Sequence, residues 1–472
     1  MQFITLEFFL FFIGVLLFAI FLKKNRKIYT VYLFLASLLF YYGFGEQNFV
    51  VLVISVVANY ILLYKIDQEK GPKARKTAFI LALIINILFL VYFKYTNFLS
   101  NSVMELASGL GIRGLNLSLE VIAPIGISFY TFRTISHLID LYRGNVERPD
   151  FTSYATYVTF FPQILSGPIS RPKDFYESLN NPKRLSYLDS EIIVLVLSGL
   201  IKKLVIASFL WEFTQGPFST PQSFSSIDLI FAALAYSCMI YTDFSGYSDI
   251  SIAVSKLMGI DVYSNFKSPY RSIGLKEFWS RWHISLSTWL KDYVYIPLGG
   301  NRGGRFNKYR NIFLTMVVSG IWHGAGINFI IWGTLHGIGS VVTHLISDRF
   351  GSNAESKKGF SILKLFGWVL TFAFVTFTWI FFNSRTPESA FYFIKGIFRS
   401  AVTENVIVST RLFIVIFVVI YFNFIGQKFT LYIKNFISEL SPIAKYIFVL
   451  LVVYAIIKLG PDMVPPFIYF SF

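Results

Sequence analysis

The chain has 472 residues, of which 55% are hydrophobic, 19% aromatic and only 14% charged, and its formal net charge is +16. Charged residues make up about 25% of a typical soluble domain, so this composition excludes an ordinary soluble globular protein. It predicts an all-α polytopic membrane protein, because apolar runs of roughly 17–25 residues, the length that crosses a bilayer, recur along the chain.

The apolar runs predict about 11 membrane-spanning helices. Asp, His and Gly residues inside the seventh and eighth runs favour breaks that face protein or water, so some runs are expected to form two short helices or re-entrant pieces. In chain order, the runs are Phe3–Leu22, Ile28–Tyr42, Phe49–Tyr64, Ala78–Phe93, Val121–Ile139, Glu191–Phe213, Ile227–Met258, Ile312–Ile346, Leu363–Phe382, Ile407–Ile425 and Tyr446–Leu459.

Lysine and arginine residues in the short loops predict the orientation of these spans. Basic clusters within residues 23–27 and 65–76 follow the first and third runs, so both loops are expected to be cytoplasmic and the N-terminus extracytoplasmic. Lys428, Lys434 and Lys445 make the loop before the last run cytoplasmic as well, which leaves the C-terminal tail, residues 461–472, outside.

The positive net charge has a simple explanation in these basic loops, which face an anionic leaflet. A minority of the cations could instead neutralise an anionic cosubstrate. No basic region stands apart from the membrane segments, so nucleic-acid binding is not expected.

Cys238 is the only cysteine, which excludes an internal disulfide and a cysteine-based metal site, and we expect no bound metal. The N-terminal sequence lacks the charged leader and cleavage site of a secretory signal, so the first run is expected to remain as a span. No internal repeat or soluble domain is apparent, and we therefore expect a single membrane domain over residues 1–472.

Residues 261–310 form the least membrane-like segment. Trp279, Trp282 and Trp289 are interleaved there with charged residues, as in amphipathic helices that lie at the membrane interface. A simple membrane-hugging connector explains the same composition.

Two histidines stand out because an ionisable group at membrane depth is costly unless it is paired or lines a wet cavity. His323 lies in "SGIWHGAGINFIIWGTLHG" among small residues that let a neighbouring backbone or a substrate approach closely, and His283 lies in "RWH" within the amphipathic segment. Imidazole can take a proton from an attacking hydroxyl near neutral pH. On residue chemistry alone, a functional role for His323 and a structural one are equally open.

Asp243 and Asp249, in "YTDFSGYSDISIA", are carboxylates inside a predicted span. Their spacing of six residues does not place them on one helix face. They could hold an ion or relay protons, and hydrogen bonding to Ser, Tyr or Arg groups is the favoured interpretation.

The chain resembles the membrane-bound O-acyltransferases along nearly its whole length. More narrowly, it is similar to the bacterial branch of alginate and peptidoglycan O-acetylation membrane proteins and the teichoic acid D-alanyl transfer protein. The resemblance is carried, in order, by "APIGISFYTFRTISHLIDLYRG", "YVTFFPQILSGPISRPKDF", "YTDFSGYSDISIA", "EFWSRWHISLSTWLKDYVYIPLGGNR", "SGIWHGAGINFIIWGTLHG" and the terminal "FIYFSF".

This resemblance implies a ring of spans around a central funnel or tunnel in a bacterial inner membrane, with the acyl donor on the cytoplasmic side. The histidine of the family's "WHG" motif is catalytic and maps onto His323, and its "RWH" companion maps onto His283. Acetyl-coenzyme A would be the donor substrate, with no bound cofactor. Candidates for binding the substrate or the developing oxyanion are Asn328, Trp322, Arg281 and Asp243.

A glycan outside the cell cannot reach a cytoplasmic thioester, so the resemblance also implies an acyl carrier. Tyr469 in the tail is the candidate, because a similar C-terminal tyrosine motif occurs on a small partner peptide of the teichoic acid system. Pro461, Pro465 and Pro466 stop helix continuation and let the tail bend inward. The acetyl group would pass to a periplasmic SGNH-type O-acetyltransferase that modifies peptidoglycan or a polysaccharide such as alginate.

Several alternatives stay open at this stage. Tyr469 could be an aromatic anchor at the interface, and transfer could be direct. The whole chain could also be a proton-coupled lipid or sugar transporter, or a silent scaffold for a periplasmic acetyltransferase.

Overall fold

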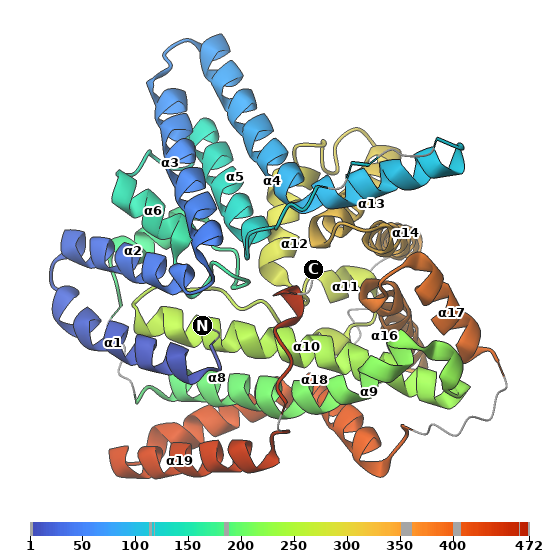
Figure 1. Ribbon diagram of the computed structural model, residues 1–472. Helices are drawn as coiled ribbons and strands as arrows, with labels where there is room; N and C mark the ends of the chain where they lie inside the picture. Colours follow the sequence, from blue (N-terminus) through green and yellow to red (C-terminus); the bar gives the residue numbers. More distant parts are fainter. Residues whose placement is uncertain are drawn as a thin grey trace. The chain divides into compact units, whose positions relative to one another are not determined.

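The computed structural model of the protein describes residues 3–112, 116–117, 119–183, 188–350, 361–399, 407–461 and 463–470. Every regular element in these ranges is a helix (Figure 1), which confirms the prediction of an all-α protein. The chain divides into two compact units, Met1–Ser186 with Ser251–Tyr263, and Tyr187–Ile250 with Ser264–Phe472. The expectation of a single domain over 1–472 stays a prediction.

The first unit is organised around α5, which is buried along most of its length. Gly126 sets its start with φ +76°, and a Cβ there would lie 2.5 Å from the carbonyl oxygen of Ile164, so glycine is needed for both the turn and the close approach. The helices of this unit are α1 (Leu6–Leu22), α2 (Arg26–Tyr42), α3 (Glu46–Gln68), α4 (Pro72–Gly109), α5 (Ile127–Arg143), α6 (Phe151–Thr159) and α7 (Pro172–Asn180).

In the second unit, the helical stretch Ser190–Ser219 lies between α10 and the pair α18 and α19 (Figure 1). This unit holds α8 (Ser190–Leu200), the π-helix η1 (Ile201–Ala207), α9 (Ser208–Ser219), η2 (Pro221–Ser223), most of α10 (Ser226–Leu257), η3 (Pro269–Arg271), α11 (Leu275–Trp279), α12 (Ile284–Leu290), the π-helix η4 (Lys291–Tyr295), α13 (Arg305–His323), α14 (Ile327–Phe350), α16 (Ile362–Asn383), α17 (Pro387–Ile397), α18 (Thr410–Glu439), α19 (Pro442–Leu459) and η5 (Ile468–Phe470).

Eight helices in the described part of the chain are long and apolar enough to cross a membrane, and each corresponds to one of the predicted runs. The other three predicted runs form α1, α2 and α5, which have 17 residues each. The eight long helical stretches are Glu46–Gln68, Pro72–Gly109, Ser190–Ser219, Ser226–Leu257, Ile327–Arg349, Ile362–Asn383, Thr410–Glu439 and Pro442–Leu459.

The two runs that were expected to break differ from each other. The run 312–346 is interrupted, because α13 ends at His323 and α14 begins at Ile327. The expected break in the run 227–258 is wrong, since α10 is one continuous helix. Its carboxylates need no break, because Asp243 and Asp249 each pair with a lysine of the neighbouring helical stretch.

The segment 261–310 contains short helices up to the start of α13 at Arg305. Several of its aromatic side chains pack inside protein, whereas Tyr263 and Phe306 are exposed. Trp282 is 1% exposed, with its ring centroid 5.1 Å from both Phe266 and Trp379, and Trp289 is buried as well. This packing places the RWH motif in the core of the second unit. The interfacial location of the segment, the central funnel and the orientation of the termini stay predictions.

Candidate active site

A tight hairpin of α13 and α14 places His323 at its turn. A Cβ on Gly320 would lie 2.2 Å from the carbonyl oxygen of Phe329 and 2.9 Å from the Cα of Gly333, so the two helices touch through their backbones. Facing glycines permit this approach. At the turn, a Cβ on Gly324 would meet the Phe329 ring at 2.1 Å. These glycines therefore allow α13 and α14 of the same chain to pack closely.

His323 is buried in an aromatic surround and faces the tail. Its ring centroid lies 5.0 Å from that of Trp332 and 5.2 Å from that of Phe382, both nearly edge-on. The Nδ1 atom of His323 is 3.4 Å from the phenolic oxygen of Tyr469. The structure thus brings the predicted catalytic base and the predicted carrier, 146 residues apart in sequence, to hydrogen-bonding distance.

His283 lies beside this pair in an unusual backbone conformation. It has φ +43° at the N-cap of α12, a left-handed conformation that residues with side chains adopt rarely and that clusters at functional sites. Asn265 stabilises the turn, because its side-chain oxygen accepts a hydrogen bond from the backbone N–H of Ser285 at 3.2 Å. The His283 ring centroid is 4.7 Å from that of Phe244 and 6.3 Å from that of Tyr469.

Burial determines the charge of His283. It lowers the pKa of this imidazole to about 3, since a charged ring is poorly solvated there. The ring is therefore neutral at physiological pH and offers one donor and one acceptor nitrogen.

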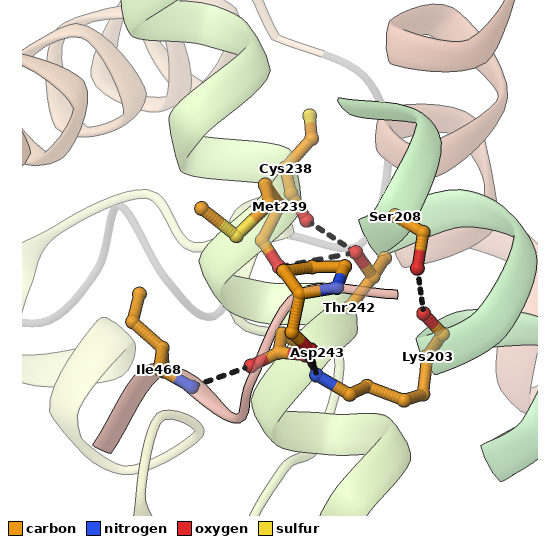
Figure 2. A network of polar contacts seen from close by, with 8 residues as sticks. Lys203, Ser208, Cys238, Met239, Thr242, Asp243 and Ile468 are labelled. Carbon is orange, nitrogen blue, oxygen red and sulfur yellow. Dashed lines mark hydrogen bonds and ion pairs between the residues drawn. The ribbon is translucent and has the colours of Figure 1, made fainter. Parts of the chain in front are cut away.

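The tail segment, described over residues 463–470, runs past Asp243 of α10 (Figure 2). The backbone N–H of Ile468 donates to Oδ2 of Asp243 at 3.0 Å. The Phe467 ring stacks on that of Tyr247, with centroids 4.3 Å apart. Asp462, Ser471 and Phe472 of the predicted tail lie outside the described residues.

Two further predicted residues, Trp322 and Asn328, lie near the hairpin turn. Trp322 is buried, with its ring centroid 6.2 Å from that of His283. The amide nitrogen of Asn328 donates to the backbone oxygen of Ser384 at 2.5 Å. One amide N–H of Asn328 is thereby engaged within the protein, and a role for either residue toward an oxyanion stays a prediction.

The structure gives Arg281 a clear local function. Its guanidinium pairs with Glu277 at 2.8 Å and donates to the backbone oxygen of Lys267 at 3.0 Å, so it ties together the loop that precedes His283. A contact of Arg281 with substrate stays a prediction.

Three residues near the tail were not identified from the sequence. Lys203 pairs with Asp243, Phe244 touches the rings of both His283 and Tyr469, and Asn265 supports the His283 turn. For Lys203, a signal was present: adjacent lysines inside an otherwise apolar run mark ionisable groups at membrane depth. Phe244 and Asn265 carry no signal of their own, because their roles depend on long-range packing.

In the described part of the chain, no group of three or more His, Cys, Asp or Glu side chains is placed to hold a metal ion. The chemistry that this arrangement offers is a buried imidazole next to a phenol, with a second imidazole close by. An imidazole in that position can take the phenolic proton and make the oxygen a nucleophile.

Comparison with known proteins identifies the family. The model of the membrane-bound O-acyltransferase family matches residues 47–385. The chain belongs to this family. It is 36% identical over 378 residues to the probable alginate O-acetylase AlgI of Pseudomonas aeruginosa. The aligned region covers 79% of this chain and 71% of the relative.

Two other relatives extend the comparison. The peptidoglycan O-acetyltransferase of Helicobacter pylori is 36% identical over 402 residues, and the aligned region covers 79% of this chain and 74% of that protein. The teichoic acid D-alanyltransferase of Streptococcus thermophilus is 28% identical over 355 residues, covering 71% and 81%.

The protein is therefore a membrane-bound acyltransferase with several membrane helices, as the sequence resemblance implies. The residues matched by the family model include Lys203, Asp243, His283 and His323, whereas Tyr469 lies beyond them.

Proposed function

We propose that the protein transfers an acetyl group from cytoplasmic acetyl-coenzyme A to the phenolic oxygen of Tyr469, and that the acetylated tail delivers the group outside the membrane. The observation that carries the proposal is the 3.4 Å distance between Tyr469 Oη and His323 Nδ1. A nucleophile and a base within hydrogen-bonding reach form the unit that acyl transfer requires.

His323 and Tyr469 together account for every proton and bond in the proposed transfer. His323 takes the phenolic proton as the Tyr469 oxygen attacks the thioester carbonyl carbon. The C–S bond then breaks, an aryl acetate forms, and the imidazolium returns the proton to the departing thiolate, which leaves as coenzyme A. In this proposal His283, neutral in its buried position, donates a hydrogen bond to the developing oxyanion.

The final acceptor is proposed from the relatives. Two of them are named for alginate and peptidoglycan O-acetylation, so we propose peptidoglycan or an exopolysaccharide such as alginate as the final acceptor. In this proposal a periplasmic partner of the SGNH type takes the acetyl group from the tail and places it on that acceptor. This route requires the tail to face the extracytoplasmic side of a bacterial inner membrane, as the basic loops predict.

The test is the intact mass, with peptide mapping, of purified protein incubated with acetyl-coenzyme A. We expect one acetyl group on Tyr469, absent in His323→Ala and in Tyr469→Phe. Release of coenzyme A that depends on an added acceptor, with no acetylated tyrosine, would replace the carrier by direct transfer. A complete lack of turnover would instead support the transporter or scaffold alternatives.

A further inference from the structure

We propose that Lys203 and Asp243 form a clamp that holds the tail segment by its backbone and so positions the Tyr469 phenol at His323. Both are positioning residues rather than catalytic residues, since neither touches the reacting atoms. The catalytic meaning of the clamp rests on the proposed function, whereas the position of the tail can be measured independently of it.

The geometry of the clamp is shown in Figure 2. Lys203 Nζ lies 2.5 Å from Asp243 Oδ1 and 3.1 Å from the backbone oxygen of Pro465. The other carboxylate oxygen, Oδ2, accepts the backbone N–H of Ile468 at 3.0 Å. Each member of the pair therefore makes one bond to its partner and one bond to the tail.

Burial makes this arrangement demanding. The side chains of Lys203 and Asp243 are 4% and 3% exposed. Buried charges need a partner and further hydrogen bonds to their remaining polar positions. Here the tail backbone supplies these bonds, at Pro465 and Ile468, so that removal of the tail would leave both charged groups incompletely satisfied.

Close packing of the α8–η1–α9 stretch on α10 brings Lys203 and Asp243 together. Gly199 and Gly246 face each other so closely that a Cβ on either would lie within 2.9 Å of the other's carbonyl oxygen. Lys203 lies in the π-helix η1, a type of turn that is frequent at functional sites. The Ser208 hydroxyl donates to the carbonyl oxygen of Lys203 at 3.0 Å.

The bonds of the clamp end one residue before Tyr469. Ile468 is held by the hydrogen bond of its N–H to Asp243, and the Phe467 ring stacks on Tyr247. Tyr469 therefore directly follows two residues whose positions are fixed, one by its backbone and one by its side chain. Because the clamp bonds only backbone atoms at residues 465 and 468, its effect on the position of the phenol does not depend on the side chains of these two residues.

The same two helical stretches provide a matched control. Lys202 pairs with Asp249 at 2.6 Å, and Ser198 also donates to Asp249 at 3.0 Å. These side chains are more exposed, 26% and 17%, and the bonds found for the Asp249 carboxylate lie within the two helical stretches. Loss of this second pair disturbs the same helices while the clamp stays intact.

The experiment measures the reaction rate of a water-soluble maleimide with Tyr469→Cys in a Cys238→Ala background, using the full-length protein purified in detergent. The clamp variant carries Lys203→Met together with Asp243→Leu, and the control carries Lys202→Met with Asp249→Leu. Removing both charges at once leaves no uncompensated buried charge, which avoids the main destabilisation that a single substitution would cause. We expect labelling at least about tenfold faster in the clamp variant, from the loss of two hydrogen bonds to charged groups.

Equal labelling of parent and clamp variant, or equal acceleration by the control pair, would overturn the clamp. If the clamp variant does not elute as a single species in size-exclusion chromatography, Asp243→Asn takes its place, with a smaller acceleration expected and an unchanged rate counting against the clamp.

A second readout uses the native Tyr469. Tail acetylation should fall at least about tenfold in the clamp variant and stay near the parent level in the control. Absence of tail acetylation in the parent protein would refute the proposed carrier, while faster labelling at residue 469 would still establish the clamp.

Discussion

At the residue scale, the site consists of two buried imidazoles and a phenol that reach one another from distant parts of the chain. His323 supplies the nitrogen that faces Tyr469, and His283 lies near the Tyr469 ring in a strained left-handed turn. Strain of this kind persists only where the surrounding structure holds it, as Asn265 does here. The two histidines are thus distinguished by their contacts, which the motifs alone do not describe.

Tyr469→Phe separates the chemistry of the tail from its packing. The phenylalanine ring keeps the contact with Phe244, whose centroid lies 4.7 Å away, but it has no oxygen to accept an acetyl group. We expect complete loss of tail acetylation with a change in unfolding free energy below about 1 kcal/mol, since the hydrogen bond between the hydroxyl and His323 is long, at 3.4 Å. Mass spectrometry and thermal unfolding in detergent measure the two quantities; a large fall in stability would indicate a structural tyrosine instead.

The buried state of His283 predicts a pH dependence of stability. Its pKa is about 3 in the folded protein and near 6.5 in the unfolded chain, so between these values the unfolded state binds the extra proton. Folding stability should therefore fall as the pH drops below 6.5, with a contribution of up to about 1.4 kcal/mol per pH unit from this group. Thermal unfolding of the parent and of His283→Gln between pH 7 and pH 4 tests this, and the variant should show the shallower decline.

At the element scale, close helix contacts set the positions of the site residues. α13 and α14 meet through Gly320 and Gly333, and the α8–η1–α9 stretch meets α10 through Gly199 and Gly246. The first contact fixes the turn at His323, and the second brings lysines opposite carboxylates. The ion pairs in turn explain why α10 is continuous in spite of Asp243 and Asp249 in its interior.

A methyl group at Gly320 should disturb the hairpin. Alanine would favour the isolated helix by about 1 kcal/mol, but its Cβ would lie 2.2 Å from the carbonyl oxygen of Phe329, so the clash decides the outcome. We expect Gly320→Ala to lower stability by about 1–3 kcal/mol and to reduce acyl transfer. Gly326→Ala is the control, because its Cβ would meet the Phe329 ring at an ordinary 3.6 Å; equal effects of both changes would argue against the packing explanation.

At the scale of the whole molecule, the function requires a defined orientation of the spans. The donor is cytoplasmic in the proposed reaction, and the acetylated tail must be reached from outside. The basic clusters of residues 23–27 and 65–76 predict this orientation, and it can be measured directly.

Single cysteines in a Cys238→Ala background test the orientation in cells. Lys70 lies in a loop expected to be cytoplasmic, and Gln47 follows a turn expected to be extracytoplasmic; both are exposed. An impermeant maleimide should label Gln47→Cys in intact cells and Lys70→Cys only after permeabilisation of the inner membrane. The reversed pattern would overturn the orientation that the basic clusters predict.

The sequence by itself determined the membrane class, the eight long apolar helices and the family, because span length, composition and motifs are local properties of the chain. It also singled out His323 and His283, since an imidazole among apolar residues is conspicuous, and the family resemblance pointed to Tyr469. Only the tertiary structure decided that α10 stays unbroken and that Lys203 meets the tail, 262 residues away. Such pairings depend on helix packing, and no local pattern of residues encodes which distant carboxylate or carbonyl a buried lysine will face.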